Sequence, residues 1–184
     1  NFSRSAGFSD IARAVRQDNI EIRTLWLGKE QHIPEDCDAL IVAGPENRIS
    51  EPELNLIRAY LEQKGRMMVM LDAATQTGLE PLLAQWGVHV SEDVVLDTSR
   101  TLTGRELFIY EYGPHPITRH LSGVTSIFYL PRSVEPLSPA EQTMDSPDKP
   151  RGVSLAACSG AGWAETDLNR KPMKYDAGVD RPGP

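Results

Sequence analysis

The chain has 184 residues, of which 40% are hydrophobic and 24% charged, the balance of a folded domain rather than of a disordered segment. Its formal net charge is −7 and its basic residues are scattered, which argues against nucleic-acid binding. No apolar run approaches the roughly 20 residues that a membrane helix needs. Because the chain opens with Asn1 and ends in Pro184, we expect an excised fragment, a single domain of a larger protein.

The first elements predicted in chain order are a helix and a strand. Ser9 is placed to cap a helix over residues 10–18, with Ile11 and Val15 four residues apart on its inner face. Apolar and polar residues then alternate over residues 20–27, which predicts a strand.

A strand, a helix and a second strand follow between residues 38 and 72. The continuous apolar run at residues 38–43 is typical of a parallel strand covered on both faces. Ser50 and Glu53 form a capping-box pattern that opens a helix, and Gly65 is suited to the left-handed conformation that ends it. Residues 66–71 are predicted as another buried strand.

The pattern continues with a second capping box at Thr77 and Glu80, a helix that Gly87 stops, and a strand over residues 88–96 bent near residues 91–93. This order, with its short loops, predicts an α/β fold with a mostly parallel sheet sandwiched by helices. Residues 1–97 would form the βαβ core.

Residues 98–184 form a second half of different character. Alternation predicts an edge strand over residues 105–112, and the rigid turn 113–116 follows it. Another strand is expected at residues 126–130. The proline-rich segment 138–151 is predicted to be a loop.

The turn after the first strand of the core is the principal candidate site. In open α/β sheets, ligands bind beyond the carboxyl ends of the strands. The competing interpretation is purely structural, since Gly44 and Pro45 also suit a tight exit from a strand. The candidate ligand-binding or partner-binding residues are Gly44, Pro45, Glu46, Asn47, Arg48, Asp72, Tyr112 and His115.

Catalysis, metal binding and a bound cofactor are not expected. Cys158 ends an apolar run, as the nucleophile of an elbow would, but Ala156 replaces the first glycine of that pattern and no histidine follows. Cys37 lies among acidic residues, which disfavour a reactive thiolate. His115 and His120 are five residues apart, a spacing that does not place them on one helix face.

Several motifs, taken in order, carry a resemblance that none of them carries alone. They are residues 38–45, 49–53, 60–66, 71–72, 82–88, Tyr112, residues 115–118, 163–166 and 180–184. Together they resemble the auxiliary (GldG-like) domain of gliding-motility-type ABC transport systems.

The resemblance implies a class I glutamine-amidotransferase-like (flavodoxin-like) three-layer sandwich, a fold similar to that of an intraflagellar-transport protein domain. It also implies a bacterial periplasmic or extracytoplasmic domain, tethered to the cytoplasmic membrane through segments outside this chain. Its partners would be the permease and ATPase subunits of an ABC transporter.

Three functions therefore stand as hypotheses. The leading one is a non-catalytic interaction or sensing domain. The second is a small-molecule or glycan-binding module that uses the crevice at the strand ends. The third is an amidotransferase-like hydrolase, which would need a nucleophile with a base in hydrogen-bond reach.

Overall fold

The computed structural model describes residues 7–73, 75–138, 140–141, 150–169 and 172–183, which divide into two compact units. Unit 1 ends at Cys37 and unit 2 begins at Asp38. Most of the predicted loop 138–151 lies outside the described residues.

Unit 1 contains the helices α1 (Ser9–Gln17) and α2 (Leu27–Glu30). The predicted first helix is therefore confirmed, although Ser9 is its first residue and not its cap, and Ile11 is 59% exposed. The strand predicted over residues 20–27 is wrong, because this segment pairs with no strand among the described residues. Instead, the Arg23 guanidinium lies 2.9 Å from a Glu21 carboxylate oxygen and 2.8 Å from one of Asp36.

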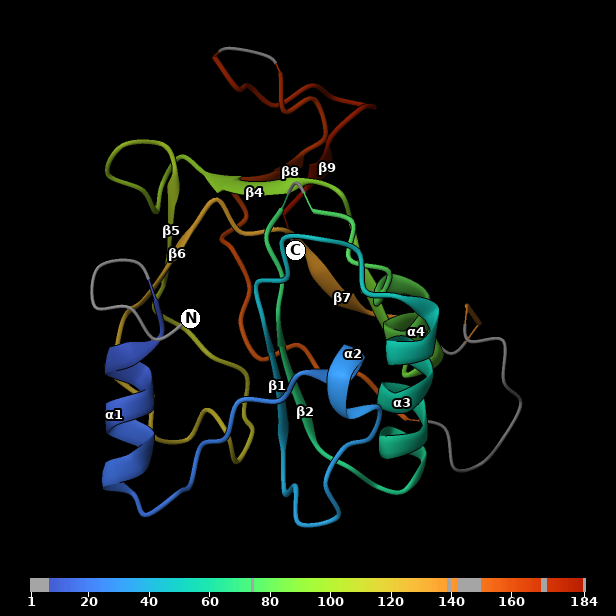
Figure 1. Cartoon of the computed structure of the whole chain (residues 1–184). Coiled ribbons are helices and arrows are strands. Elements are labelled where there is room, and N and C mark those ends of the chain that lie inside the picture. Colours follow the sequence, from blue (N-terminus) through green and yellow to red (C-terminus); the bar gives the residue numbers. More distant parts are fainter. Residues whose placement is uncertain (1–6, 74, 139, 142–149, 170–171, 184) are drawn as a thin grey trace. The chain divides into compact units, whose positions relative to one another are not determined.

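Unit 2 opens with the predicted strand, helix and strand. β1 (Leu40–Ala43) and β2 (Met67–Met70) are parallel and in register from Leu40↔Met67 to Ala43↔Met70, with α3 (Glu51–Glu62) between them in the chain (Figure 1). α3 buries the three apolar residues that its periodicity singles out: Leu54, Ile57 and Leu61. The sequence also predicted that both strands are covered on both faces. This prediction is wrong, since the paired residues Ile41 and Met68 are 53% and 55% exposed.

The ends of α3 show how local chemistry sets its limits. The capping box is present, and the Glu53 carboxylate accepts the Ser50 N–H at 3.1 Å. At the other end Lys64, not Gly65, has a positive φ of 66°. Gly65 is needed for another reason, because a Cβ there would collide with the ring of Tyr60.

The next elements pair with strands far along the chain. α4 (Glu80–Gln85) leads to β3 (Val88–Val90), which runs antiparallel to β7 (Val134–Pro136). β4 (Val94–Asp97) pairs antiparallel with β8 (Gly162–Glu165), and β9 (Arg181–Pro182) extends that sheet. β5 (Glu106–Ile109) and β6 (Ser126–Tyr129) form a separate antiparallel pair.

The predicted fold class is therefore wrong. The described part of the chain holds four small sheets, mostly antiparallel, and not a mostly parallel sheet in a flavodoxin-like, glutamine-amidotransferase-like sandwich. The physical reason is that apolar patterning marks a segment as a strand, whereas its hydrogen-bonding partner is set by long-range packing. The bend at residues 91–93 was expected, but the two strands that it separates join different sheets.

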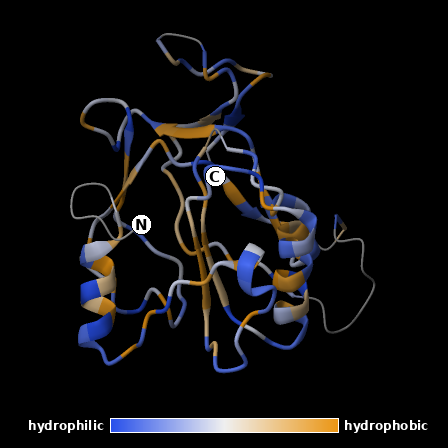
Figure 2. Cartoon of the chain, in the orientation of Figure 1, coloured by the Kyte–Doolittle hydropathy of each residue, from blue (hydrophilic) through white to orange (hydrophobic). Residues whose placement is uncertain are grey.

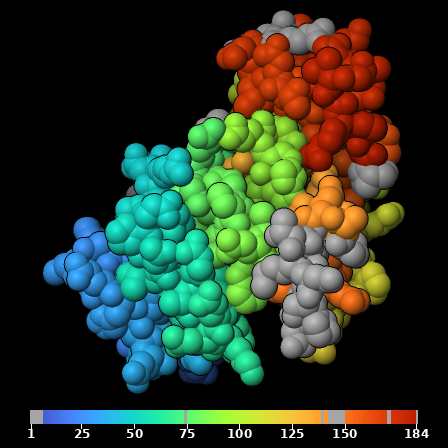
Figure 3. Space-filling model, turned by 90° about the vertical axis from the view of Figure 1, so that its right-hand side faces the viewer, coloured from blue at the N-terminus to red at the C-terminus, as the bar shows by residue number. Residues whose placement is uncertain are grey.

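The hydrophobic core of unit 2 gathers around β4 and β8. Val94, Leu96 and Trp163 are buried together, and Leu130, among others, packs against them. Trp163 is thus a core residue. A second apolar layer lies on α3 and α4, which lie side by side (Figures 1 and 3). Figure 2 shows that β1, β2 and β4 are also hydrophobic, although Ile41 on β1 and Met68 on β2 are exposed.

Truncation of a core leucine tests how much this second layer contributes to the free energy of unfolding. Leu82 on α4 is 2% exposed, so Leu82→Ala should lower the free energy of unfolding by about 2–5 kcal/mol through lost burial and a residual cavity. Leu102→Ala is the matched control, because Leu102 is 83% exposed and its truncation should change stability by about 0.5 kcal/mol at most. Urea titration of both variants provides the measurement, and equal losses would contradict the packing.

Candidate functional site

The structure brings Gly44 and Asp72 together at the carboxyl ends of β1 and β2. Gly44 has a φ of +54°, and its N–H donates to the Met70 carbonyl at 2.9 Å. A Cβ at Gly44 would lie 3.7 Å from an Asp72 carboxylate oxygen. The glycine thus provides the tight exit from the strand and leaves the Asp72 carboxylate close to the backbone.

The rest of the 44–49 loop packs against the turn before α4. The Ile49 N–H donates to the Thr77 carbonyl at 2.8 Å. The stem of Arg48 passes so close to Gly78 that a Cβ there would lie 3.3 Å from its Cγ. Glu46 and Asn47 are exposed, so the loop presents its polar side chains to solvent.

Arg132 lies beside the end of β2 and the turn before α4, and sequence reasoning missed it. Its side chain is 2% exposed, and its guanidinium donates to the carbonyls of Ser91 at 2.7 Å, Thr75 at 3.1 Å and Asp72 at 3.3 Å. Glu80 is 3.9 Å from the same guanidinium. In a sequence, an arginine beside a proline carries no signal of burial, so only the folded chain identifies it.

One nitrogen of this buried guanidinium, Nη2, has no hydrogen-bond partner among the described residues. The three carbonyls come from the end of β2, the turn before α4 and the bend between β3 and β4. Arg132 therefore positions the backbone of the strand-end loops, including that of Asp72.

Tyr112 and His115 lie elsewhere. The segment 110–123 lines a depression of about 710 Å³, and Figure 1 shows this yellow-green to yellow segment apart from the ends of β1 and β2. The structure therefore separates the predicted site residues into a strand-end group and a group on this loop segment.

Hydrogen bonds within the segment and to β6 hold the walls of this depression in place. The Tyr112 hydroxyl donates to the Ser126 hydroxyl at 2.6 Å and accepts the Ser126 N–H at 3.1 Å. His115 Nδ1 accepts the Ile117 N–H at 3.2 Å, and the Thr118 hydroxyl donates to the Gly113 carbonyl at 2.6 Å. Tyr112 and His115 are thus structural partners of their own loop as well as lining residues.

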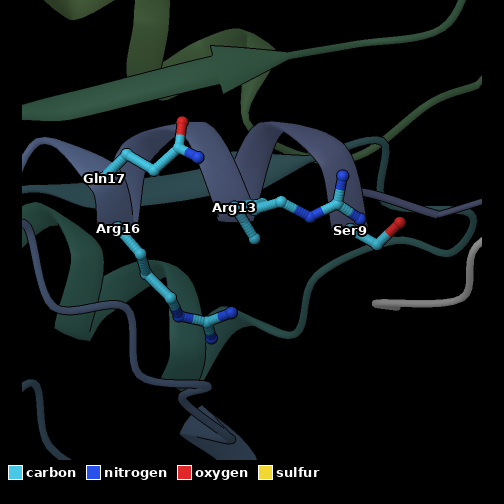
Figure 4. Close-up of a pocket in the computed structure, with 5 residues that line it drawn as sticks. Ser9, Arg13, Arg16 and Gln17 are labelled. Carbon is cyan, nitrogen blue, oxygen red and sulfur yellow. The ribbon is translucent and has the colours of Figure 1, made fainter.

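A second hollow, of about 410 Å³, is lined by five residues of α1 (Figure 4). Arg13 extends along the helix toward Ser9, whereas Arg16 and Gln17 point to different sides. Arg13 also pairs with Asp10 at 3.1 Å. Because the polar groups do not converge, this hollow offers no organised set of ligand contacts.

The surroundings of Cys158 oppose nucleophilic chemistry. Burial raises the pKa of the Cys158 thiol, and the negative charge of Asp97 raises it further. The neighbouring Ser159 donates its N–H to Asp97 at 2.8 Å, and its hydroxyl lies 2.9 Å from that of Ser99. A reactive cysteine needs the opposite electrostatic setting, which stabilises the thiolate.

Two other kinds of feature are absent from the described ranges. No group of three histidine, cysteine, aspartate or glutamate side chains there is placed to hold a metal ion. No helix in that part of the chain has the length and apolar character to span a membrane.

Replacement of Arg132 tests its positioning role. Arg132→Met keeps much of the buried volume but leaves three carbonyl oxygens without their donor, and each such loss costs about 1–3 kcal/mol. We expect the free energy of unfolding to fall by at least about 3 kcal/mol in guanidinium titration. Arg66→Met is the control at an exposed arginine, and a similar loss there would argue against the assigned role.

The carboxylate of Glu80 makes the same region sensitive to pH. Burial acts to raise its pKa, but hydrogen bonds donated by Thr77 and Gly78 outweigh burial and hold the pKa below its ordinary value of 4.5. Because the pKa is lower in the folded state, the stabilisation is complete above pH 4.5 and is lost as the pH falls through the folded pKa.

Glu80→Gln should therefore be less stable than the native chain at pH 7, and the difference should shrink as the pH falls below 4.5. Thermal unfolding across this range measures the difference. Glu62→Gln, at an exposed position, is the control. A difference that does not change with pH would contradict the proposed hydrogen bonding to the carboxylate.

Known proteins resemble this chain in sequence family and in fold. No curated protein sequence matches this chain significantly. Among solved structures, the mmIFT52 N-terminal domain is similar, with a TM-score of 0.64 at 16% identity, covering 98% of this chain and 77% of that one. At this identity the likeness concerns the fold alone. Residues 5–143 match the family described as ABC-type uncharacterized transport system, and the chain belongs to this ABC-transporter auxiliary family.

Proposed function

We propose that this chain is a non-catalytic interaction or sensing domain that works outside the bacterial cytoplasmic membrane as part of an ABC transport system. The observation that carries the proposal is the family match over residues 5–143, which associates the chain with ABC-type transport. The gliding-motility-like character, the periplasmic location and the membrane tether are proposed from the sequence resemblance.

The surroundings of Cys158, the cysteine considered above as a nucleophile, support a binding role over catalysis. The electrostatic setting of Cys158 favours the neutral thiol, and Asp97 organises the turn around Ser99 and Ser159 through hydrogen bonds. These contacts are those of a structural turn. An amidotransferase-like hydrolase would instead require an activated nucleophile beside a base.

The partners proposed are the permease and ATPase subunits of the same transport system. An auxiliary domain contributes to transport by binding, so its functional surface consists of exposed loops and strand edges on a rigid core. Unit 2 offers two such regions, the strand-end loop with Gly44 and Asp72 and the segment 110–123.

Binding of a small molecule or glycan is the second candidate, and one observation favours it. The depression along residues 110–123 has tyrosine side chains in its lining, Tyr110 and Tyr112, and Tyr110 is 51% exposed. Aromatic faces of this kind suit the apolar faces of sugar rings, with polar groups fixing orientation. The strand-end loop, by contrast, exposes the carboxylates of Glu46 and Asp72 to solvent.

The proposal is tested by purifying the full-length gene product that contains this chain from membranes of its native host. A tag on that protein should recover a permease and an ATPase after mild solubilisation, identified by mass spectrometry. An unrelated tagged membrane protein of similar abundance serves as the control. Recovery of the tagged protein without transporter subunits would contradict the proposal and favour the ligand-binding alternative.

A further inference from the structure

Residues 172–183, which we call the strap, cover one edge of β8 and contribute β9 to the β4–β8–β9 sheet (Figure 1). β9 has two residues, and its Pro182 has no N–H to donate. The neighbouring Gly183 N–H donates to the Gly162 carbonyl at 2.7 Å. A ladder this short provides few backbone hydrogen bonds, so the strap depends on its side chains for the rest of its attachment.

The amides along β8 alternate between β4 and the strap. The Val95 N–H, opposite Ala164 in the register, donates at 2.7 Å to a carbonyl outside β8. By the alternation of an antiparallel ladder, the Ala164 N–H therefore points away from β4 and toward Arg181 on β9. The Thr166 N–H, just after β8, donates to Asp180 of the strap at 3.2 Å. The amides of Ala164 and Thr166 thus report whether the strap is in place.

The Arg181 guanidinium ties the strap to β7 and to the bend between β3 and β4. It lies 2.8 Å from the carboxylate of Glu135 and 3.2 Å from that of the buried Asp93. It also donates to the hydroxyls of Ser91 at 3.0 Å and Ser133 at 2.8 Å. We call these contacts of Arg181 the latch.

The latch can open without leaving a buried charge unpaired. The Arg181 side chain is 44% exposed, so water reaches it readily, and Glu135 is 51% exposed. The buried Asp93 keeps the hydrogen bonds from the Ser133 N–H and hydroxyl, both at 2.8 Å. Arg132 differs, because its side chain is 2% exposed and its loss would leave three carbonyls without a donor. The latch is therefore the less costly of the two arginine contacts to break.

The strap covers the Trp163 ring but buries little apolar surface of its own. The rings of Tyr175 and Trp163 meet edge-on with centroids 6.5 Å apart, and Met173 packs against the same core cluster. Tyr175 is nevertheless 40% exposed, and Val179 is 65% exposed. Segments with few buried apolar contacts open locally at a fraction of the free energy of global unfolding.

We propose that the strap opens as a unit and that the latch controls its opening. Opening uncovers the edge of β8 and the Trp163 ring, while the β4–β8 pair stays formed. Because the latch consists of partly exposed charged contacts, higher ionic strength shifts the strap toward the open form. The inference concerns this chain alone and does not depend on its association with a transporter.

Hydrogen exchange of the whole chain, followed by NMR, tests the proposal. The protection factors of the Ala164 and Thr166 amides should be at least about tenfold lower than those of Trp163 and Glu165, whose amides face β4. Raising NaCl from about 0.05 M to about 0.5 M should lower only the first pair further. Equal protection of all four amides, or no response to salt, would overturn the proposal.

Replacement of the latch residue provides a second test. Arg181→Met removes the charged contacts and keeps an apolar stem, so it should lower the protection of Ala164 and Thr166 at least about tenfold and abolish their response to salt. Trp163 should keep its protection. Lys174→Met, at an exposed lysine of the strap, is the matched control and should change none of these amides. Unchanged protection in Arg181→Met would overturn the proposal, as would an equal loss at Trp163, which would show unfolding of the whole sheet.

Discussion

The hydrogen bonds of Arg132 are the interaction on which the arrangement of unit 2 depends. A buried guanidinium that donates to three carbonyls connects the end of β2, the turn before α4 and the bend between β3 and β4. Each of these segments is too irregular to satisfy its own carbonyls through secondary structure. The Arg132 side chain thereby provides hydrogen bonds between these segments, which in a larger sheet would come from neighbouring strands.

A second polar network joins two of the small sheets to each other. The buried Asp93 accepts the Ser133 N–H and hydroxyl, both at 2.8 Å, and Arg181 on β9 lies 3.2 Å from the same carboxylate. Arg181 also contacts Glu135 on β7 at 2.8 Å. The β3–β7 pair and the β4–β8–β9 sheet are therefore held together by charge-assisted hydrogen bonds, which are directional and favour one relative placement of their strands.

This construction bears on function because it leaves strand edges and faces uncovered. A single large sheet sandwiched by helices would have both of its faces covered and would bind ligands at one crevice. Four small sheets instead expose the aromatic face of β5–β6 and the paired Ile41 and Met68. Exposed apolar faces bounded by polar groups are typical of surfaces that contact other proteins, which agrees with an auxiliary role in transport. The fold alone does not specify that role, since one fold supports many functions.

Local patterns determined much of unit 2. The capping box at Ser50 located α3, and the apolar runs located β1 and β2 with their parallel pairing. The pattern at Thr77 and Glu80 located α4, although Leu79 and not Thr77 is the N-cap of this helix. The turn at Gly44 was also predictable, because a tight exit from a strand demands a residue that tolerates positive φ. In each case the decisive chemistry lies within a few residues of sequence.

The sequence by itself thus determined α1, α3 and α4, the strands β1 and β2, the Gly44 turn and the family resemblance. The tertiary structure decided which strands pair after residue 88, that Arg132 is buried, and that Tyr112 and His115 lie apart from Gly44 and Asp72. Backbone donors and acceptors are nearly identical in every residue, so a strand's sequence carries little information about its partner. Partner choice, burial of an arginine and exposure of β6 emerge only when distant segments pack together.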